Sequence, residues 1–331
     1  ISAIFATVIY GACVSFIEGR QDTEAIVASL NLFLVVAGSM ARGLGAAILG
    51  SGITPSAMPG IASLIGFCGC LVMLPLLNAV PQPEEEDRAQ RGKRGAMPFS
   101  QQKRFFCGYA LGIILSIVSY TVVMAIRAFR DYYAKELYTT ALGKQPQPSL
   151  YVLADLPGAV AVCVIISLLA KIRSNRNAAN AMMTIMIVGA FILGSATLLY
   201  RTEKISKLSF LITCGIGIYT TYLVSGSAFF DRLLASSGLA GTIVPLQFIS
   251  DGSGWFGTIG FLLYESFSSR KSADDALKLF AILCTYCSVC MIVCLGTMQL
   301  YFWRRLRIPT AEARGSYTRI NNMVGDSYES C

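Results

Sequence analysis

The 331-residue sequence contains no histidine, and only 14% of its residues are charged. The chain therefore lacks the commonest general base, the commonest zinc ligand and the side chain that most readily exchanges protons near neutral pH. It also has no Ser-His, Cys-His or H-E-x-x-H arrangement and no P-loop. We therefore expect no enzymatic activity, no metal and no cofactor, and any proton transfer would have to use carboxylates.

Long apolar stretches take up most of the chain, which is 54% hydrophobic. Each is close to the ~20 residues that an α-helix needs to cross the hydrocarbon core of a bilayer. The nine stretches are 1–17, 25–50, 55–80, 105–126, 150–170, 178–200, 208–230, 238–264 and 276–303. They predict an all-α, polytopic, integral membrane protein with about nine transmembrane helices. Its first partner is the lipid of the plasma membrane or an endomembrane.

Basic residues are more frequent in one alternating set of loops than in the other. The richer set contains Arg20, Arg88, Arg91, Lys93, Arg94, Lys103, Arg104, Lys171, Arg173, Arg176, Arg232, Arg304, Arg305, Arg307, Arg314 and Arg319. Cytoplasmic loops carry an excess of Lys and Arg, so this side is predicted to be cytoplasmic. Juxtamembrane cations that face anionic lipid also explain the net charge of +8. We therefore expect no nucleic acid partner.

The segment Pro81–Arg104 is rich in charge and proline and has no apolar periodicity. It is typical of a cytoplasmic linker between two helical bundles. Three apolar stretches precede it and six follow. Because Ile1 already lies in an apolar stretch, we expect further spans upstream, which would give a six-plus-six arrangement.

This layout resembles that of the major facilitator superfamily. The runs Phe16–Arg20, Ala128–Tyr132 and Lys171–Arg176 are similar to a branch of that superfamily that is catalogued as a domain of unknown function. The resemblance implies that residues 1–80 hold the last three helices of an N-terminal bundle and that 81–104 is the linker. Residues 105–303 would then form a C-terminal six-helix bundle, and 304–331 a cytoplasmic tail.

Charged residues inside the apolar stretches are the candidates for substrate binding or coupling. They are Arg42, Arg127, Arg130, Asp131, Asp155 and Asp251. An unpaired ion in hydrocarbon costs ~3 kcal/mol or more, so such residues persist with a partner or a wet cavity. Helical spacing places Arg127 beside Asp131 at i,i+4, and this group could instead be a self-neutralised helix end.

The two other acidic candidates differ in their predicted depth. Asp155 lies five residues after Leu150, near the outer interface, whereas Asp251 lies near the centre of its stretch. Gly252 and Gly254 flank Asp251 and would allow a neighbouring helix or a ligand to approach closely. Asp251 is therefore a candidate for proton coupling, and the alternative is a buried acid hydrogen-bonded to another helix.

Two apolar stretches that the superfamily resemblance makes symmetry mates end in a similar way. The first ends with Glu18 and Arg20, and the seventh is followed by Asp231 and Arg232. These acid and base residues could form a cytoplasmic gate between the two bundles. The alternative is that each caps its own helix in the headgroup region.

Together these features predict a secondary transporter that moves a small solute by alternating access, with protons as a candidate coupling ion. The binding site is expected between the two bundles near the bilayer midplane. The alternative is a transporter-like membrane receptor or scaffold that does not transport. The sequence does not define the substrate.

Overall fold

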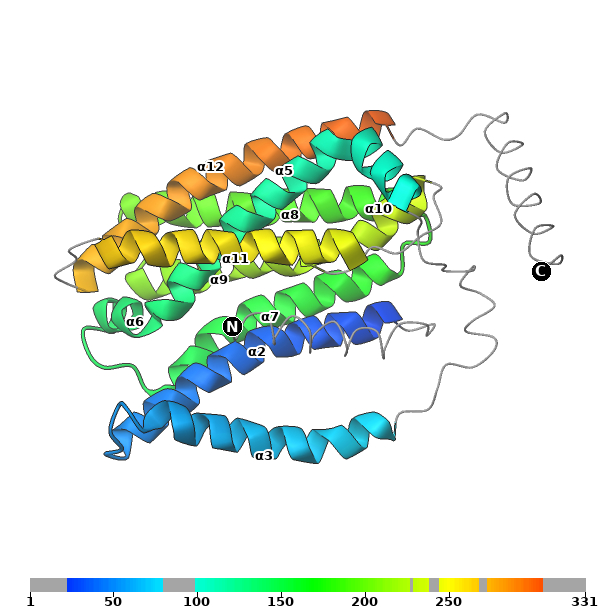
Figure 1. The fold of residues 1–331 in the computed structure, drawn as a ribbon. Helices are drawn as coiled ribbons and strands as arrows, with labels where there is room; N and C mark the ends of the chain where they lie inside the picture. The colour runs from blue at the N-terminus through cyan, green and yellow to red at the C-terminus, as the bar shows by residue number, and fades with distance from the viewer. Residues whose placement is uncertain (1–22, 80–98, 227–228, 238–243, 268–272, 306–331) are drawn as a thin grey trace, which may run out of the picture.

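The computed structural model describes residues 23–79, 99–226, 229–237, 244–267 and 273–305. All regular secondary structure in these ranges is helical, in ten helices (Figure 1). The helices are α2 (Thr23–Gly50), α3 (Met58–Asn78), α5 (Phe99–Tyr132), α6 (Ala134–Leu142), α7 (Pro148–Ala170), α8 (Asn175–Arg201), α9 (Lys207–Gly226), α10 (Phe229–Ser237), α11 (Val244–Phe267) and α12 (Ala273–Arg305).

Six of the described helices are long and apolar enough to cross a membrane. They are Met58–Asn78 (α3), Phe106–Tyr132 in α5, Pro148–Ala170 (α7), Asn175–Arg201 (α8), Lys207–Gly226 (α9) and Asp275–Arg305 in α12, and α2 adds a shorter apolar part, Val35–Gly50. The described residues therefore confirm the expectation of a helical protein with helices that can span a membrane. The count of nine spans stays a prediction. The first predicted stretch, residues 80–98 of the linker region and the tail after Arg305 lie outside the described residues, whereas residues 99–104, the end of the predicted linker, form the start of α5.

Large apolar side chains cover much of the outer surface. On α3 they include Leu64, Phe67 and Leu71, and α3 has no buried residue. On α7, Leu153, Val160, Val164 and Leu168 point outward, and α8 and α12 have similar exposed rows. Exposed apolar area on this scale is unusual on a soluble monomer. It is the surface expected of helices that contact lipid.

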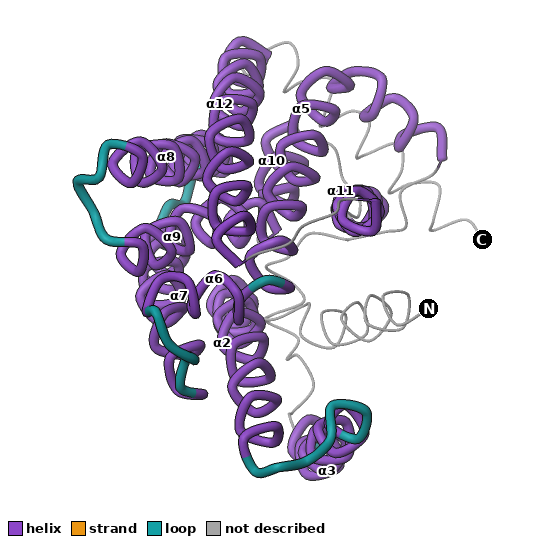
Figure 2. The backbone as a smooth tube through the Cα atoms, turned by 90° about the vertical axis from the view of Figure 1, so that its left-hand side faces the viewer, coloured by secondary structure: helices purple, strands orange, loops and turns teal. Residues whose placement is uncertain are grey.

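The long helices run in alternate directions between two ends of the molecule, named here the α6 end and the α10 end after the short helices that lie there (Figure 1). Helix α9 packs against α5, α7 and α8, and α12 packs on α5 and α8. Helix α11 packs on α5, α2 packs on α7, and α3 packs on α2 (Figure 2). The contact of α2 with α7 joins the chain before the 81–104 segment to the chain after it.

Glycines allow two helix pairs to approach closely. A Cβ atom on Gly217 of α9 would lie 2.7 Å from the carbonyl oxygen of Gly189 on α8. A Cβ atom on Gly257 of α11 would lie 2.7 Å from the carbonyl oxygen of Thr121 on α5, and one on Gly254 would lie 2.9 Å from the Tyr120 ring. The predicted close approach beside Asp251 is thus found at Gly254, whereas Gly252 faces open space in the described part of the chain.

Two helix boundaries differ from the predicted stretches. The fourth stretch was expected to end at 126, but α5 continues to Tyr132, so its charged residues lie within the helix. The seventh, 208–230, is covered by α9 and the start of α10 in the described residues, and Asp231 and Arg232 lie in the first turn of α10. Helix α5 continues because its polar residues find partners in the tertiary structure.

Candidate functional site

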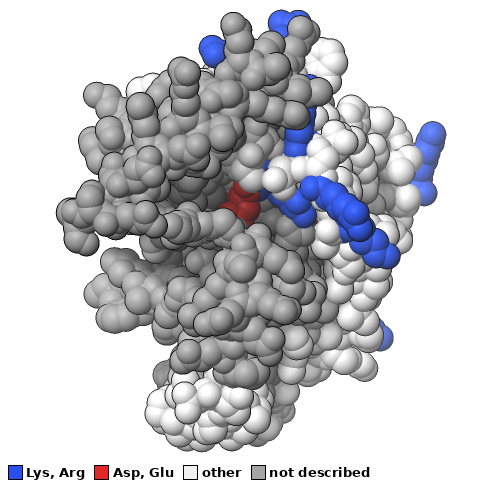
Figure 3. Space-filling model, turned by 90° about the vertical axis from the view of Figure 1, so that its right-hand side faces the viewer, with Lys and Arg blue, Asp and Glu red and all other residues white. Residues whose placement is uncertain are grey.

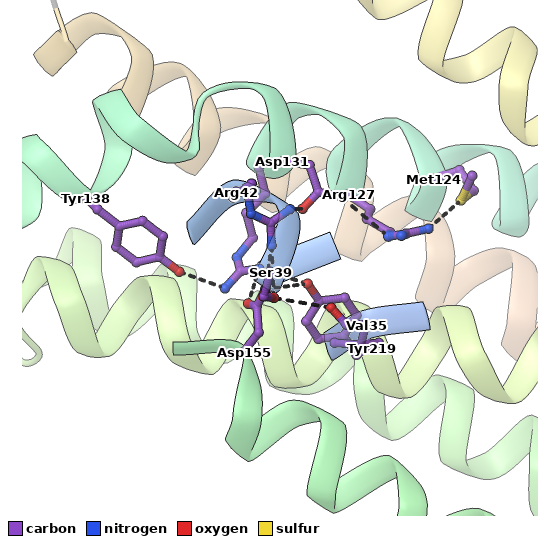
Figure 4. A network of polar contacts seen from close by, with 10 residues as sticks. Val35, Ser39, Arg42, Met124, Arg127, Asp131, Tyr138, Asp155 and Tyr219 are labelled. Carbon is purple, nitrogen blue, oxygen red and sulfur yellow. Dashed lines mark hydrogen bonds and ion pairs between the residues drawn. The ribbon is translucent and has the colours of Figure 1, made fainter. Parts of the chain in front are cut away.

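Five of the six charged residues predicted inside the membrane form one cluster (Figure 4). Arg42 comes from α2, Arg127, Arg130 and Asp131 come from α5, and Asp155 comes from α7. Four ion pairs connect them, with N–O distances from 2.6 to 3.6 Å. The cluster therefore lies where three helices meet.

Asp155 is at the centre of the cluster and is only 2% exposed. Its Oδ1 lies 2.6 Å from Nη1 of Arg130, and its Oδ2 lies 2.6 Å from Nη2 of Arg42. The hydroxyls of Ser39 and Tyr219 also donate hydrogen bonds to Oδ2. Asp155 is thus enclosed by side chains from α2, α5 and α9, and their cations and hydroxyls replace water around its charge.

Arg42 connects α2 to both acidic residues of the cluster. Its Nη1 donates to Oδ1 of Asp131 at 2.7 Å, and its Nη2 donates to Oδ2 of Asp155 at 2.6 Å. Nη2 also donates to Oγ of Ser39, one turn earlier on α2, at 3.1 Å. Gly43 allows this approach, since a Cβ atom there would lie 2.8 Å from the carbonyl oxygen of Pro148 at the start of α7.

Arg130 is held by two phenols as well as by Asp155. Its Nη1 donates to the Tyr219 hydroxyl at 3.1 Å, and its Nη2 donates to the Tyr138 hydroxyl of α6 at 3.0 Å. Burial raises the pKa of Tyr138, so its phenol stays neutral and accepts this bond. The guanidinium lies against Gly215, where a Cβ atom would be 2.9 Å from Nη2.

Arg127 has different surroundings. Its guanidinium lies over the ring of Tyr222, 4.5 Å from the centroid, which is a cation–π geometry. Its Nε is 3.6 Å from Oδ2 of Asp131, the i,i+4 partner that the helical spacing predicted. Its Nη1 is 3.8 Å from the sulfur of Met124, a weak acceptor.

The cluster lies within the helices and nearer to the α6 end. Asp155 is seven residues after Pro148, about 10 Å along α7, and Tyr219 is twelve residues after Lys207, about 18 Å along α9.

Asp251, the sixth candidate, lies outside the cluster on α11. The Tyr120 hydroxyl of α5 donates a hydrogen bond to its Oδ1 at 2.7 Å. The rings of Tyr120 and Tyr222 are 5.7 Å apart, and Tyr222 in turn lies under Arg127. Asp251 is therefore linked to the cluster through two tyrosines, and part of its surface remains accessible.

The predicted gate residues fall into two groups. Glu18 and Arg20 lie outside the described residues, so their distance from α10 is untested. Arg232 of α10 donates from Nη1 to Oδ1 of Asn175, the first residue of α8, at 2.7 Å. Figure 3, which views the α10 end, shows basic side chains above and to one side of a smaller acidic patch.

The uncharged members of the site are residues that the sequence did not single out. Ser39 precedes Arg42 by three residues, so the helical period could have placed it on the same face. Tyr138 and Tyr219 are ordinary tyrosines in the sequence, and the fold brings them to Arg130 from two other helices. Within the described ranges, no three Cys, Asp or Glu side chains are grouped closely enough to hold a metal ion.

Residues 4–305 match the family described as "Family of unknown function (DUF5690)". The chain belongs to this family. The DUF5690 match covers every described helix and all the charged residues of the cluster, so the cluster is part of the DUF5690 region. No curated protein and no solved structure matches the chain. The expected domain of unknown function is confirmed, and its relation to the major facilitator superfamily stays a prediction.

Proposed function

We propose that the protein is a secondary transporter that moves a small solute by alternating access, and that the contact of α2 with α7 opens and closes. The observation that supports this most directly is the position of Arg42. Its guanidinium joins α2 to Asp131 on α5 and to Asp155 on α7. Alternating access needs contacts of this kind, which hold two helix groups together in one state and separate in another.

The ion pairs of Arg42 are suited to separation because both of its acidic partners have a second cation. Asp131 is 3.6 Å from Arg127, and Asp155 is 2.6 Å from Arg130. When α2 moves away, neither carboxylate is left as an isolated charge in a low-dielectric environment. Leaving such a charge unpaired would cost several kcal/mol, so the second cations lower the barrier to opening.

The proposal includes the two-bundle arrangement of the major facilitator superfamily. Residues 1–80 would belong to one bundle and 105–303 to the other, with the 81–104 linker in the cytoplasm. Support comes from the alternate direction of the helices and from the packing of α2, which precedes the linker, on α7, which follows it. The α10 end would face the cytoplasm because Lys171, Arg173, Arg176, Arg304 and Arg305 lie in the loops and helix ends there.

Arg42 and its partners would then close the outer side of the transport path. Proton coupling through Asp251, next to Tyr120, belongs to the same proposal. The candidate cytoplasmic gate of Glu18, Arg20, Asp231 and Arg232 would close the opposite side.

Transport can be tested before the substrate is identified. Purified protein is reconstituted into liposomes, which are incubated with a mixture of small metabolites under an imposed pH gradient, and mass spectrometry then identifies the contents. We expect at least one small molecule to accumulate with the wild-type protein and not in protein-free liposomes or with Arg42→Ala. No enrichment over protein-free liposomes would contradict transport and favour the receptor or scaffold alternative.

A further inference from the structure

The cluster contains one more cation than it has anions. Three guanidinium groups, from Arg42, Arg127 and Arg130, share two carboxylates, from Asp131 and Asp155. Glu136 on α6 is the next carboxylate along the chain and makes no ion pair with any of these arginines in the described structure. An uncompensated charge at this depth is unfavourable in an apolar environment, so the excess cation needs an explanation.

The contacts identify Arg127 as the excess cation. Arg42 and Arg130 each direct both terminal nitrogens at oxygen atoms 2.6 to 3.1 Å away. The contacts of Arg127 are a thioether at 3.8 Å, an aromatic ring and a carboxylate oxygen at 3.6 Å from Nε. The Nε atoms of all three arginines lack a hydrogen-bond partner among the described residues, so Arg127 differs from the other two at its terminal nitrogens. A guanidinium carries five N–H donors, so most of the donors of Arg127 are unused within the described structure.

Arg127 is also accessible. Its side chain is 21% exposed, whereas that of Arg130, three residues later on α5, is 4% exposed. Asp131 and Arg42, the neighbours of Arg127 in the cluster, are 26% and 19% exposed. The exposed part of the cluster therefore includes the one arginine that has donors to spare. The Tyr222 ring covers one face of the guanidinium, and Nε is buried beside Asp131, so an acceptor would bind the terminal nitrogens.

We propose that Arg127 binds the carboxylate of a small organic solute that carries a single negative charge. The planar fork of a guanidinium matches a carboxylate, and two parallel N–H···O bonds give such a pair both strength and orientation. One added negative charge makes the cluster neutral, whereas a dianion would leave it negative. This inference rests on the proposed transport function, since it names the chemical class of the transported solute.

Thermal unfolding of the purified protein in detergent tests the inference without a transport assay. The probes are acetate and benzoate, with acetamide and benzamide as neutral controls of the same shape. At concentrations about tenfold above Kd, a ligand of the folded state raises Tm by about 2 °C. We expect at least one carboxylate to raise Tm and its amide to have no effect.

Variants separate a binding role from a structural one. Arg127→Gln should keep the wild-type Tm, because the excess charge is removed, and should lose the response to carboxylates. Arg127→Lys keeps the positive charge but lacks the planar guanidinium, so it should bind the carboxylates at least tenfold more weakly than the wild-type protein. Arg201→Gln, at an exposed position at the end of α8 that makes no described contact with the cluster, should respond to carboxylates like the wild-type protein.

Several results would overturn the inference. Equal stabilisation by amides, or a full response of Arg127→Gln to carboxylates, would exclude recognition by Arg127. Arg130→Gln removes the buried partner of Asp155 and should lower Tm. If Arg127→Gln lowers Tm by as much, the charge of Arg127 has a structural role instead of a binding role. An absence of any response to either carboxylate would also contradict it. If carboxylates bind and the liposomes accumulate nothing, the transport proposal is wrong and the carboxylate site at Arg127 stands. If the liposomes accumulate only neutral or cationic solutes, transport stands and the carboxylate site is wrong.

Discussion

Arg130 and Asp155 form an ion pair of 2.6 Å in which both side chains are almost completely buried. Among the described residues, Asp155 is the one carboxylate in ion-pair contact with Arg130. Asp131, the next residue on α5, points instead to Arg42. The pair therefore joins α5 to α7 whether or not α2 is in contact with them. This makes it the fixed part of the cluster, and Arg42 the part that can be released.

Replacement of Asp155 by Asn should destabilise the protein strongly. It leaves the Arg130 charge buried without a carboxylate, which costs about 3–5 kcal/mol in comparable cases. The measurement is the midpoint of thermal unfolding in detergent, with Glu203→Gln on the exposed surface as the control. The double variant Arg130→Met with Asp155→Leu should recover most of the loss, because it removes both charges. A wild-type midpoint for Asp155→Asn would show that the pair contributes little.

Gly215→Ala should disturb the cluster without changing any charge. The added Cβ would lie 2.9 Å from Nη2 of Arg130, so the guanidinium must shift away from Tyr138 or Tyr219. Overpacking of this kind costs about 1–3 kcal/mol. Gly252→Ala, where the added Cβ meets open space in the described part of the chain, is the matched control and should have no effect on the unfolding midpoint. Equal midpoints for the two variants would contradict the tight fit around Arg130.

Removal of the Arg42 charge should loosen the contact of α2 with α7. Ala159 of α7 is completely buried in an apolar cluster that also contains Val35 of α2. In a background without native cysteines, Ala159→Cys should react faster with a water-soluble maleimide when Arg42→Gln is also present. Ala190→Cys, buried on α8 away from α2, should react equally slowly in both backgrounds. An unchanged rate at Ala159→Cys would exclude a releasing role for Arg42.

Asp251→Asn tests proton coupling. Asn keeps the size of the side chain and still accepts the hydrogen bond from Tyr120, but it cannot exchange a proton. With a substrate found in the liposome experiment, accumulation driven by a pH gradient should be lost, while exchange of substrate across the membrane should partly remain. Tyr120→Phe, which keeps the carboxyl group, should retain accumulation. If Asp251→Asn accumulates as much substrate as the wild-type protein, Asp251 does not couple protons to transport and has a structural role.

The orientation can be checked by labelling single cysteines in intact cells. Gly92→Cys, in the 81–104 segment, should be protected from a membrane-impermeant reagent, because that segment is predicted to be cytoplasmic. Lys144→Cys lies between α6 and α7, at the opposite end of the described helices, and should be labelled. Disruption of the cells should expose Gly92→Cys. Labelling of Gly92→Cys from outside would reverse the topology.

The sequence by itself determined that the protein is helical and apolar enough to lie in a membrane, because hydrophobicity over about 20 residues depends on composition alone. It also identified the charged residues that are costly in such helices. The contact of Arg127 with Asp131 followed from the helical period, which fixes neighbours four residues apart.

The tertiary structure alone decided which of the other charges meet. Arg42 binds Asp131 and Asp155 at sequence separations of 89 and 113 residues, and Tyr219 reaches Asp155 from 64 residues away. No local pattern encodes such pairs, because they depend on which helices pack together and on where glycines such as Gly43 and Gly215 leave space. For the same reason the sequence does not show that side chains from α2, α5 and α9 enclose Asp155. The excess positive charge at Arg127 also depends on the tertiary structure, because the packing of the helices decides which carboxylate pairs with which arginine.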